Sequence, residues 1–72
     1  MDHDASKLAD LADTEQHLSA CDRNLAHRRA MIEELERGGH DVRGERVVLL
    51  ELENTRQLYV NDRERLLKEL GR

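Results

Sequence analysis

The sequence predicts an all-α fold: an antiparallel two-helix coiled-coil hairpin that forms a single domain over residues 1–72. Three observations support this prediction. The chain contains no proline, and leucine recurs at seven-residue spacing in both halves. The strong helix-breaking stretch between the halves is Gly38-Gly39-His40-Asp41, which predicts a turn over residues 38–41. Because two amphipathic helices bury only part of their apolar surface against each other, we expect two hairpins to dimerise into a four-helix bundle.

The first helix is predicted over about residues 4–37. Apolar side chains recur there every seven residues, at Leu11, Leu18, Leu25 and Ile32. The positions three residues later complete a heptad seam: Thr14, Cys21, Arg28 and Leu35. Such a seam, sustained over about four heptads, is typical of a coiled coil. Asp4 or Ser6 can cap the start of this helix, and Gly38 is expected to take the left-handed conformation that ends it.

The second helix is predicted over about residues 42–70, with Asp41 as its N-cap. Its seam consists of Val42, Leu49, Leu52, Tyr59, Leu66 and Leu70. Three more apolar residues widen this seam to over about 100° of the helix surface: Val48, Val60 and Leu67. Gly44 lies in the first turn and is unfavourable there by about 1 kcal/mol relative to alanine. This helix is therefore apolar over a wider arc than one partner helix covers.

A short turn makes the two helices antiparallel neighbours, and pairing outward from it predicts their register. Ile32 should lie near Val47 and Val48, and Cys21 near Tyr59. Leu11 should lie near the stretch from Leu66 to Leu70.

Three arginines fall within or beside the apolar stripes: Arg28, Arg56 and Arg63. A buried arginine needs a carboxylate partner, because an unpaired buried charge is strongly destabilising. Glu45, Glu51 and Glu53 are the expected partners, across the hairpin or across a dimer. In the alternative, favoured interpretation, the aliphatic stems pack on the seam while the guanidinium groups reach water.

The composition is that of a solvated helical protein. Charged residues make up 39% of the chain, and the net charge is −4. Residues 1–37 hold nine acidic and five basic side chains, whereas residues 41–72 hold seven of each. This acidic balance argues against nucleic-acid binding. We expect no membrane association, because the longest apolar run extends only from Val47 to Leu50.

The single cysteine, Cys21, excludes an intrachain disulfide and suits a reducing compartment. Together with the absence of a signal-peptide pattern, this predicts a cytoplasmic protein.

No pattern of reactive side chains predicts catalysis, and two helices alone form no cleft, so we expect no enzyme, no catalytic residue and no cofactor. His17 and Cys21 are four residues apart and could offer two ligands to zinc, with Asp13 one turn earlier. Core packing is the favoured role of Cys21, because a thiol at a seam position behaves as a small apolar group. His40 beside Asp41 is best explained as a polar turn followed by a cap. We therefore expect no metal site.

The excess apolar arc on the second helix predicts an association surface. The residues expected to form it, from both helices, are Leu49, Leu52, Arg56, Tyr59, Arg63, Leu66, Leu70, Leu18 and Leu25. The favoured function is a non-enzymatic interaction or scaffold module that forms a homodimer. One alternative is a regulatory adaptor that presents the same surface to a different protein. A further, less favoured one is a small metal or redox sensor that uses Cys21 and His17.

The middle of the chain resembles a group of short bacterial hypothetical proteins. The shared features are a leucine-rich helix, a Gly-His-Asp turn at 39–41, a Leu-Leu pair followed by Leu-Glu at 49–53, and an ending similar to residues 62–70. The resemblance extends over most of residues 15–70. It implies a helical hairpin and a cytoplasmic, bacterial origin, and it implies no particular activity.

Overall fold

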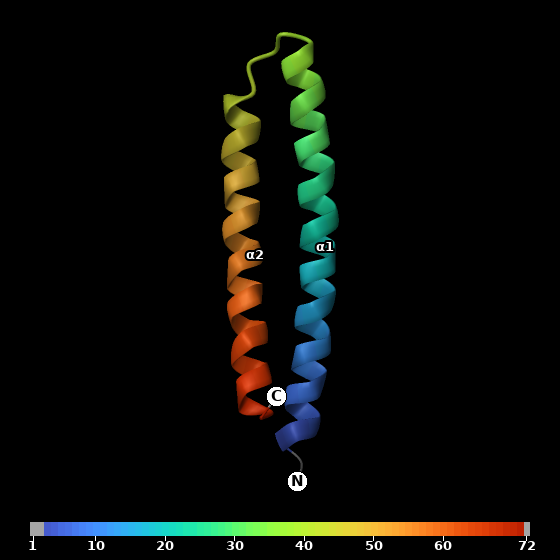
Figure 1. The fold of residues 1–72 in the computed structure, drawn as a ribbon, viewed down its shortest axis with the longest axis vertical. Coiled ribbons are helices and arrows are strands. Elements are labelled where there is room, and N and C mark those ends of the chain that lie inside the picture. Colours follow the sequence, from blue (N-terminus) through green and yellow to red (C-terminus); the bar gives the residue numbers. More distant parts are fainter. Residues whose placement is uncertain (1–2, 72) are drawn as a thin grey trace.

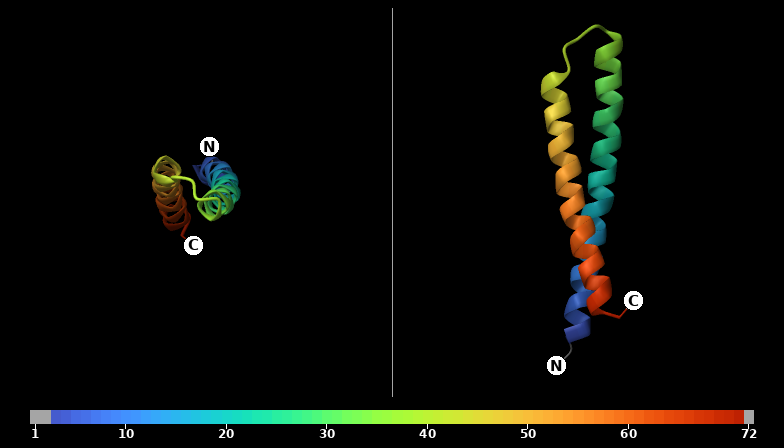
Figure 2. Two further views of the ribbon diagram at one scale, coloured as in Figure 1. Left: turned by 90° about the horizontal axis from the view of Figure 1, so that it is seen from above. Right: turned by 60° about the vertical axis from the view of Figure 1, so that its left-hand side comes forward.

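The computed structural model describes residues 3–71, which form two helices, α1 (His3–Arg37) and α2 (Arg43–Glu69). The helices run antiparallel, side by side, joined by one turn at the end of the molecule where α1 ends (Figure 1). They cross at a shallow angle along their length (Figure 2). The molecule measures 58 × 17 × 14 Å. The predicted helical hairpin is confirmed, and the predicted bounds of both helices agree with the structure to within one residue.

The heptad seam of α1 is the face that packs against α2. Its buried members are Leu11, Thr14, Leu25 and Ile32, which are 2–8% exposed, while Leu18, Cys21 and Leu35 are half-buried. Thr14 is accommodated because its hydroxyl donates a hydrogen bond to the Asp10 carbonyl at 2.9 Å. A buried hydroxyl that is paired in this way avoids the desolvation penalty of an unsatisfied polar group.

The turn corrects the prediction for the glycine pair. Gly39, and not Gly38, takes the left-handed conformation, with φ +78°. The Gly39 amide donates to the Glu36 carbonyl at 3.0 Å, and the His40 amide donates to the Leu35 carbonyl at 3.0 Å. These two bonds form a Schellman motif, in which the residue after the C-cap is left-handed. Because α1 keeps its helical bonding through the Gly38 amide, which donates to Glu34 at 3.1 Å, the left-handed position falls one residue later than predicted.

The start of α2 also differs by one residue from the prediction. Val42 is the N-cap, and Asp41 lies just before it. Asp41 still makes the hydrogen bond expected of it, because its Oδ1 accepts from the Arg43 backbone amide at 3.0 Å. The Arg43 guanidinium also donates to both Asp41 carboxylate oxygens, at 2.7–3.1 Å. The side-chain and backbone hydrogen bonds from Arg43 lower the pKa of Asp41 below its usual value.

The lowered pKa gives a signed pH prediction for Asp41. A carboxyl group with a lower pKa in the folded state stabilises the fold at neutral pH, and this contribution is lost as the pH falls through that pKa. We therefore expect Asp41→Ala to lower the melting temperature at pH 7, and the difference from the wild type to shrink progressively below about pH 4. Thermal melts followed by circular dichroism at several pH values test this. A difference that stays constant down to pH 2 would show that the charge of Asp41 plays no part.

The core that α2 contributes is small. Val42 and Leu66 are buried, at 7% and 3% exposure, and most other seam residues of this helix are only half-buried. Of the two valines expected opposite Ile32, Val48 is half-buried, but Val47 is 57% exposed and faces solvent. The C-cap of α2 is Leu70, and the residue after it, Gly71, is a second left-handed glycine with φ +76°. Neither α1 nor α2 has a segment apolar enough to cross a lipid bilayer within residues 3–71.

Candidate interaction surfaces

One edge of the hairpin holds a ladder of interhelical ion pairs. The four charged residues that α1 contributes are spaced seven residues apart, and each has a partner of opposite charge on α2. The pairs are Glu15–Arg63 at 3.6 Å, Asp22–Arg56 at 2.6 Å, Arg29–Glu53 at 3.9 Å and Glu36–Arg46 at 2.7 Å. The pairs run from the open end to the turn and agree with the register predicted from the turn. We call these eight side chains the ion-pair ladder.

The third pair of the ladder has the reverse polarity. Arg29 is the basic member on α1, whereas the other three α1 members are acidic. A slip of one heptad would place Arg29 against Arg46 in one direction and against the uncharged Val60 in the other. Exposed ion pairs add little stability individually, so their main effect is to disfavour wrong registers.

The ladder corrects the partners predicted for the seam arginines. Arg56 pairs with Asp22 and Arg63 with Glu15, both on α1, and Glu53 pairs with Arg29. The side chains of Arg56 and Arg63 are 41% and 43% exposed, so their charged ends reach water. This agrees with the favoured interpretation, in which the stems pack and the guanidinium groups remain solvated. Seven-residue spacing of charges beside the α1 seam is the sequence signal that would have revealed these partners.

Exchanging the charges of the inverted pair tests the ladder. We expect Arg29→Glu to destabilise the hairpin by up to about 1 kcal/mol, because it places two glutamates opposite each other. Adding Glu53→Arg should restore most of that loss, and 1 M salt should reduce both effects. Urea denaturation at low and high salt measures them. A double variant whose loss equals the sum of the two single losses would show that the pair does not interact.

Arg28 differs from the other seam arginines. Its residue is half-buried, and its Nε atom is buried with no hydrogen-bond partner. Within residues 3–71, no ion pair joins it to Glu45, Glu51 or Glu53. The predicted ion pair between Arg28 and one of these glutamates is therefore not formed within a single hairpin.

The opposite edge of the seam carries an aromatic contact. The His17 ring stacks on the Tyr59 ring, with a centroid distance of 4.9 Å and an interplanar angle of 10°. Tyr59 was expected beside Cys21, which lies one turn further along α1; Cys21 is a half-buried free thiol. In the described part of the chain, no three His, Cys, Asp or Glu side chains gather in a way that could hold a metal ion.

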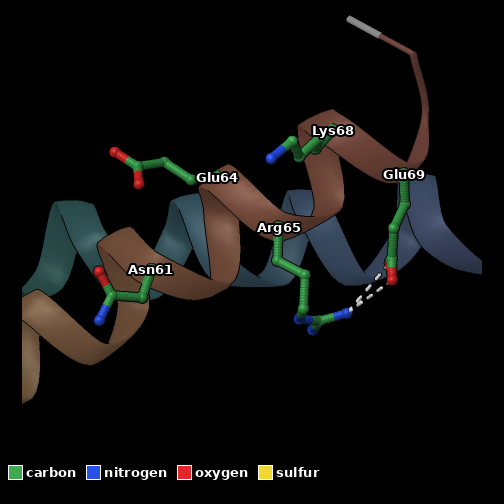
Figure 3. A pocket seen from close by; sticks show the side chains of 5 residues that line it. All are labelled: Asn61, Glu64, Arg65, Lys68 and Glu69. Atoms are coloured by element: carbon green, nitrogen blue, oxygen red, sulfur yellow. Dashed lines mark hydrogen bonds and ion pairs between the residues drawn. The ribbon is translucent and has the colours of Figure 1, made fainter.

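The depression shown in Figure 3 lies on the outer surface of α2 near its C-terminal end. Its volume is about 550 Å³, and its lining residues are Asn61, Glu64, Arg65, Lys68 and Glu69. All five belong to one helix, and their side chains extend outward from it (Figure 3). Arg65 donates to the Glu69 carboxylate at 3.1 and 3.3 Å. This is a shallow space between solvated side chains and not a cleft that would enclose a substrate.

The residues predicted for the association surface divide into two groups. Leu25 and Leu66 are 2% and 3% exposed, because each packs inside the hairpin. They therefore have almost no surface left for a second chain. The others are half-buried along the α1–α2 contact: Leu18, Leu49, Leu52, Arg56, Tyr59, Arg63 and Leu70.

The large apolar side chains that remain exposed lie elsewhere. In the part of the chain that the structure describes, they are Leu8, Val47, Leu50 and Leu58, at 40%, 57%, 58% and 65% exposure. Three of the four belong to α2, on the side that faces away from α1. In the sequence, these three residues lie outside the heptad positions of the α2 seam. Heptad position alone does not show that they are the most exposed of the large apolar residues.

Comparison with known proteins adds no assignment. No protein-family model matches the chain, and neither a curated protein nor a solved structure shows significant similarity to it.

Proposed function

We propose that the chain is a non-enzymatic helical interaction module that forms a homodimer. The observation that supports this most directly is the surface that one hairpin leaves exposed. The chain exposes 5464 Å², whereas a compact monomer of its mass exposes about 4,600 Å². The surplus of roughly 850 Å² is close to the area of about 800 Å² that each partner buries in a standard protein–protein interface.

The small core gives a second reason for association. The apolar residues buried in the described chain number five, and Leu66 is the one such residue within α2 itself. A domain of this size rarely obtains more than about 3–5 kcal/mol from one core, and small domains commonly add a second copy of themselves. In a dimer, α2 would bury apolar side chains that now face water. Whether the four helices form the expected bundle or a flatter array depends on which face of α2 meets the second copy.

A second candidate is a regulatory adaptor that presents the exposed face of α2 to a different protein. The same three side chains, Val47, Leu50 and Leu58, favour this alternative. An amphipathic helix that docks in a groove uses apolar anchors along one face; Val47 and Leu50 are three residues apart, and Leu58 follows eight residues later on the same face.

Size-exclusion chromatography with light scattering, over a range of micromolar concentrations, separates the two candidates. A homodimer predicts twice the chain mass of 8.4 kDa, with dissociation on dilution. An adaptor predicts a monomer at every concentration, with partly lost helicity. A monomer that is fully folded and stable would contradict the proposal of self-association.

A further inference from the structure

The outer face of α2 has a pattern of side chains that is symmetric about Asn54. Leu50 and Leu58 lie four residues to either side of Asn54, and Arg46 and Asp62 lie eight residues to either side. All five are exposed in the hairpin. On a helix of about 100° per residue, the two leucines lie within about 40° of Asn54. We call the face formed by Arg46, Leu50, Asn54, Leu58 and Asp62 the Asn54 face.

We propose that this face binds the same face of a second copy, with the two α2 helices antiparallel and a two-fold axis passing beside Asn54. This inference rests on the proposed self-association and names the surface that performs it. Each leucine of one copy then meets the other leucine of its partner, Leu50 against Leu58. An isologous contact requires such self-complementarity, because every residue pair occurs twice across the axis.

Charge is complementary in one pair of this arrangement, although the same register also brings Arg43 of one copy towards Arg65 of the other, further from the axis. Arg46 of one copy lies opposite Asp62 of the other at both ends of the contact. Each already has one partner in its own chain: Arg46 donates to Glu36 at 2.7 Å, and Arg65 lies 3.9 Å from Asp62. Their side chains are nonetheless 54% and 56% exposed, so both remain accessible. The pairing joins them into a row of four alternating charges at each end. Parallel helices would instead place Arg46 against Arg46.

The C-terminal half of the face is less charged than its N-terminal half, where the exposed Glu51 lies three residues before Asn54. Between residues 54 and 61, the one charged side chain is Arg56, and it points into the ion-pair ladder, where its Nε donates to Asp22 at 2.6 Å. Leu58, at 65% exposure, is the most exposed of the large apolar residues in the described chain. Asn54 meets its own copy at the axis, where each carboxamide can donate to and accept from the other. A single polar residue in an apolar helix contact fixes register and the number of chains.

This arrangement differs from the four-helix bundle. The residues of the Asn54 face are exposed, whereas the seam residues of α2 that pack against α1 are buried or half-buried, so the second hairpin packs on the side of α2 away from α1. The four helices then form one layer, in the order α1, α2, α2, α1.

The substitution Leu58→Asp tests the surface. We expect Leu58→Asp to raise the dimer Kd about a hundredfold or more, because two buried leucines become two desolvated charges in each dimer. Far-ultraviolet circular dichroism of the variant should match that of the wild-type chain diluted to its monomeric state, since Leu58 is exposed in the hairpin. Gln16→Asp adds the same charge to an exposed position on α1 and should leave the Kd unchanged. Sedimentation equilibrium measures all three proteins.

A charge exchange keeps the test independent of Leu58. Arg46→Glu should weaken the dimer, and Arg46→Glu with Asp62→Arg should restore it. Positions 46 and 62 are about 24 Å apart along one helix, so the restoration can only act between chains. A wild-type dimer that Leu58→Asp leaves intact, or a double exchange that fails to restore affinity, would overturn the Asn54 face but not self-association. A wild-type chain that remains monomeric would overturn both.

Discussion

Leu25→Ala is expected to unfold most of the hairpin near physiological temperature. Leu25 is 2% exposed, the lowest value among the buried apolar residues, and it lies midway along the α1 seam. Replacing a buried leucine by alanine is destabilising by about 2–5 kcal/mol, through lost burial and the cavity that remains. A single core of this size supplies only about 3–5 kcal/mol in total. Thermal melts followed by circular dichroism should show a fall in the melting temperature of at least about 10 °C.

Leu8→Ala is the matched control for this variant. It makes the same chemical change in the same helix, but Leu8 is 40% exposed. The loss should therefore be well under half of that for Leu25→Ala, when both are measured at one protein concentration. Equal losses at the two positions would contradict the assignment of Leu25 to the core of the hairpin.

Two glycine-to-alanine substitutions are expected to change stability in opposite directions. Gly39 has φ +78°, a conformation that is unfavourable for alanine by about 1–2 kcal/mol. Gly44 lies in the first turn of α2, and a Cβ added there meets nothing within 4 Å. Gly44→Ala should therefore stabilise the hairpin by up to about 1 kcal/mol, because alanine loses less backbone entropy in a helix.

Urea denaturation of the two single variants and of the double variant measures this pair. The two effects should add in the double variant, because the sites share no contact. Loss of stability in Gly44→Ala would show that position 44 has a role other than continuing the helix. An unchanged midpoint in Gly39→Ala would show that the Schellman turn does not limit stability.

The helices could be predicted because their signals repeat. Leucine recurs every seven residues along both helices, and a single glycine pair separates them. These two features predict the bounds of both helices to within one residue. The choice between Gly38 and Gly39 could not be predicted, because either glycine can take a positive φ. That choice depends on which amide makes the last helical bond.

The contacts between the helices were less predictable than the helices. The partners of Arg56 and Arg63 lie beside the α1 seam, whereas the prediction sought them among the glutamates of α2. The association surface was predicted from the width of the apolar arc on α2. Arc width does not show which part of the arc packs against α1, so Leu25 and Leu66 were included although both are buried inside the hairpin. The spacing about Asn54 is present in the sequence, but the exposure of all five residues follows only from the packing of α2 against α1.

A cysteine at position 54, in a Cys21→Ser background, tests the central claim most directly. The axes of two helices in contact lie about 8–10 Å apart. Facing Cα atoms on a two-fold axis lie closer together than the helix axes, so they can reach the Cα–Cα distance of about 4.4–6.8 Å that a disulfide needs. Mild oxidation of Asn54→Cys should therefore convert most of the protein to a covalent dimer, visible on a non-reducing gel, while Gln16→Cys in the same background should remain monomeric. Slow crosslinking at equal rates from both positions would contradict self-association through the outer face of α2.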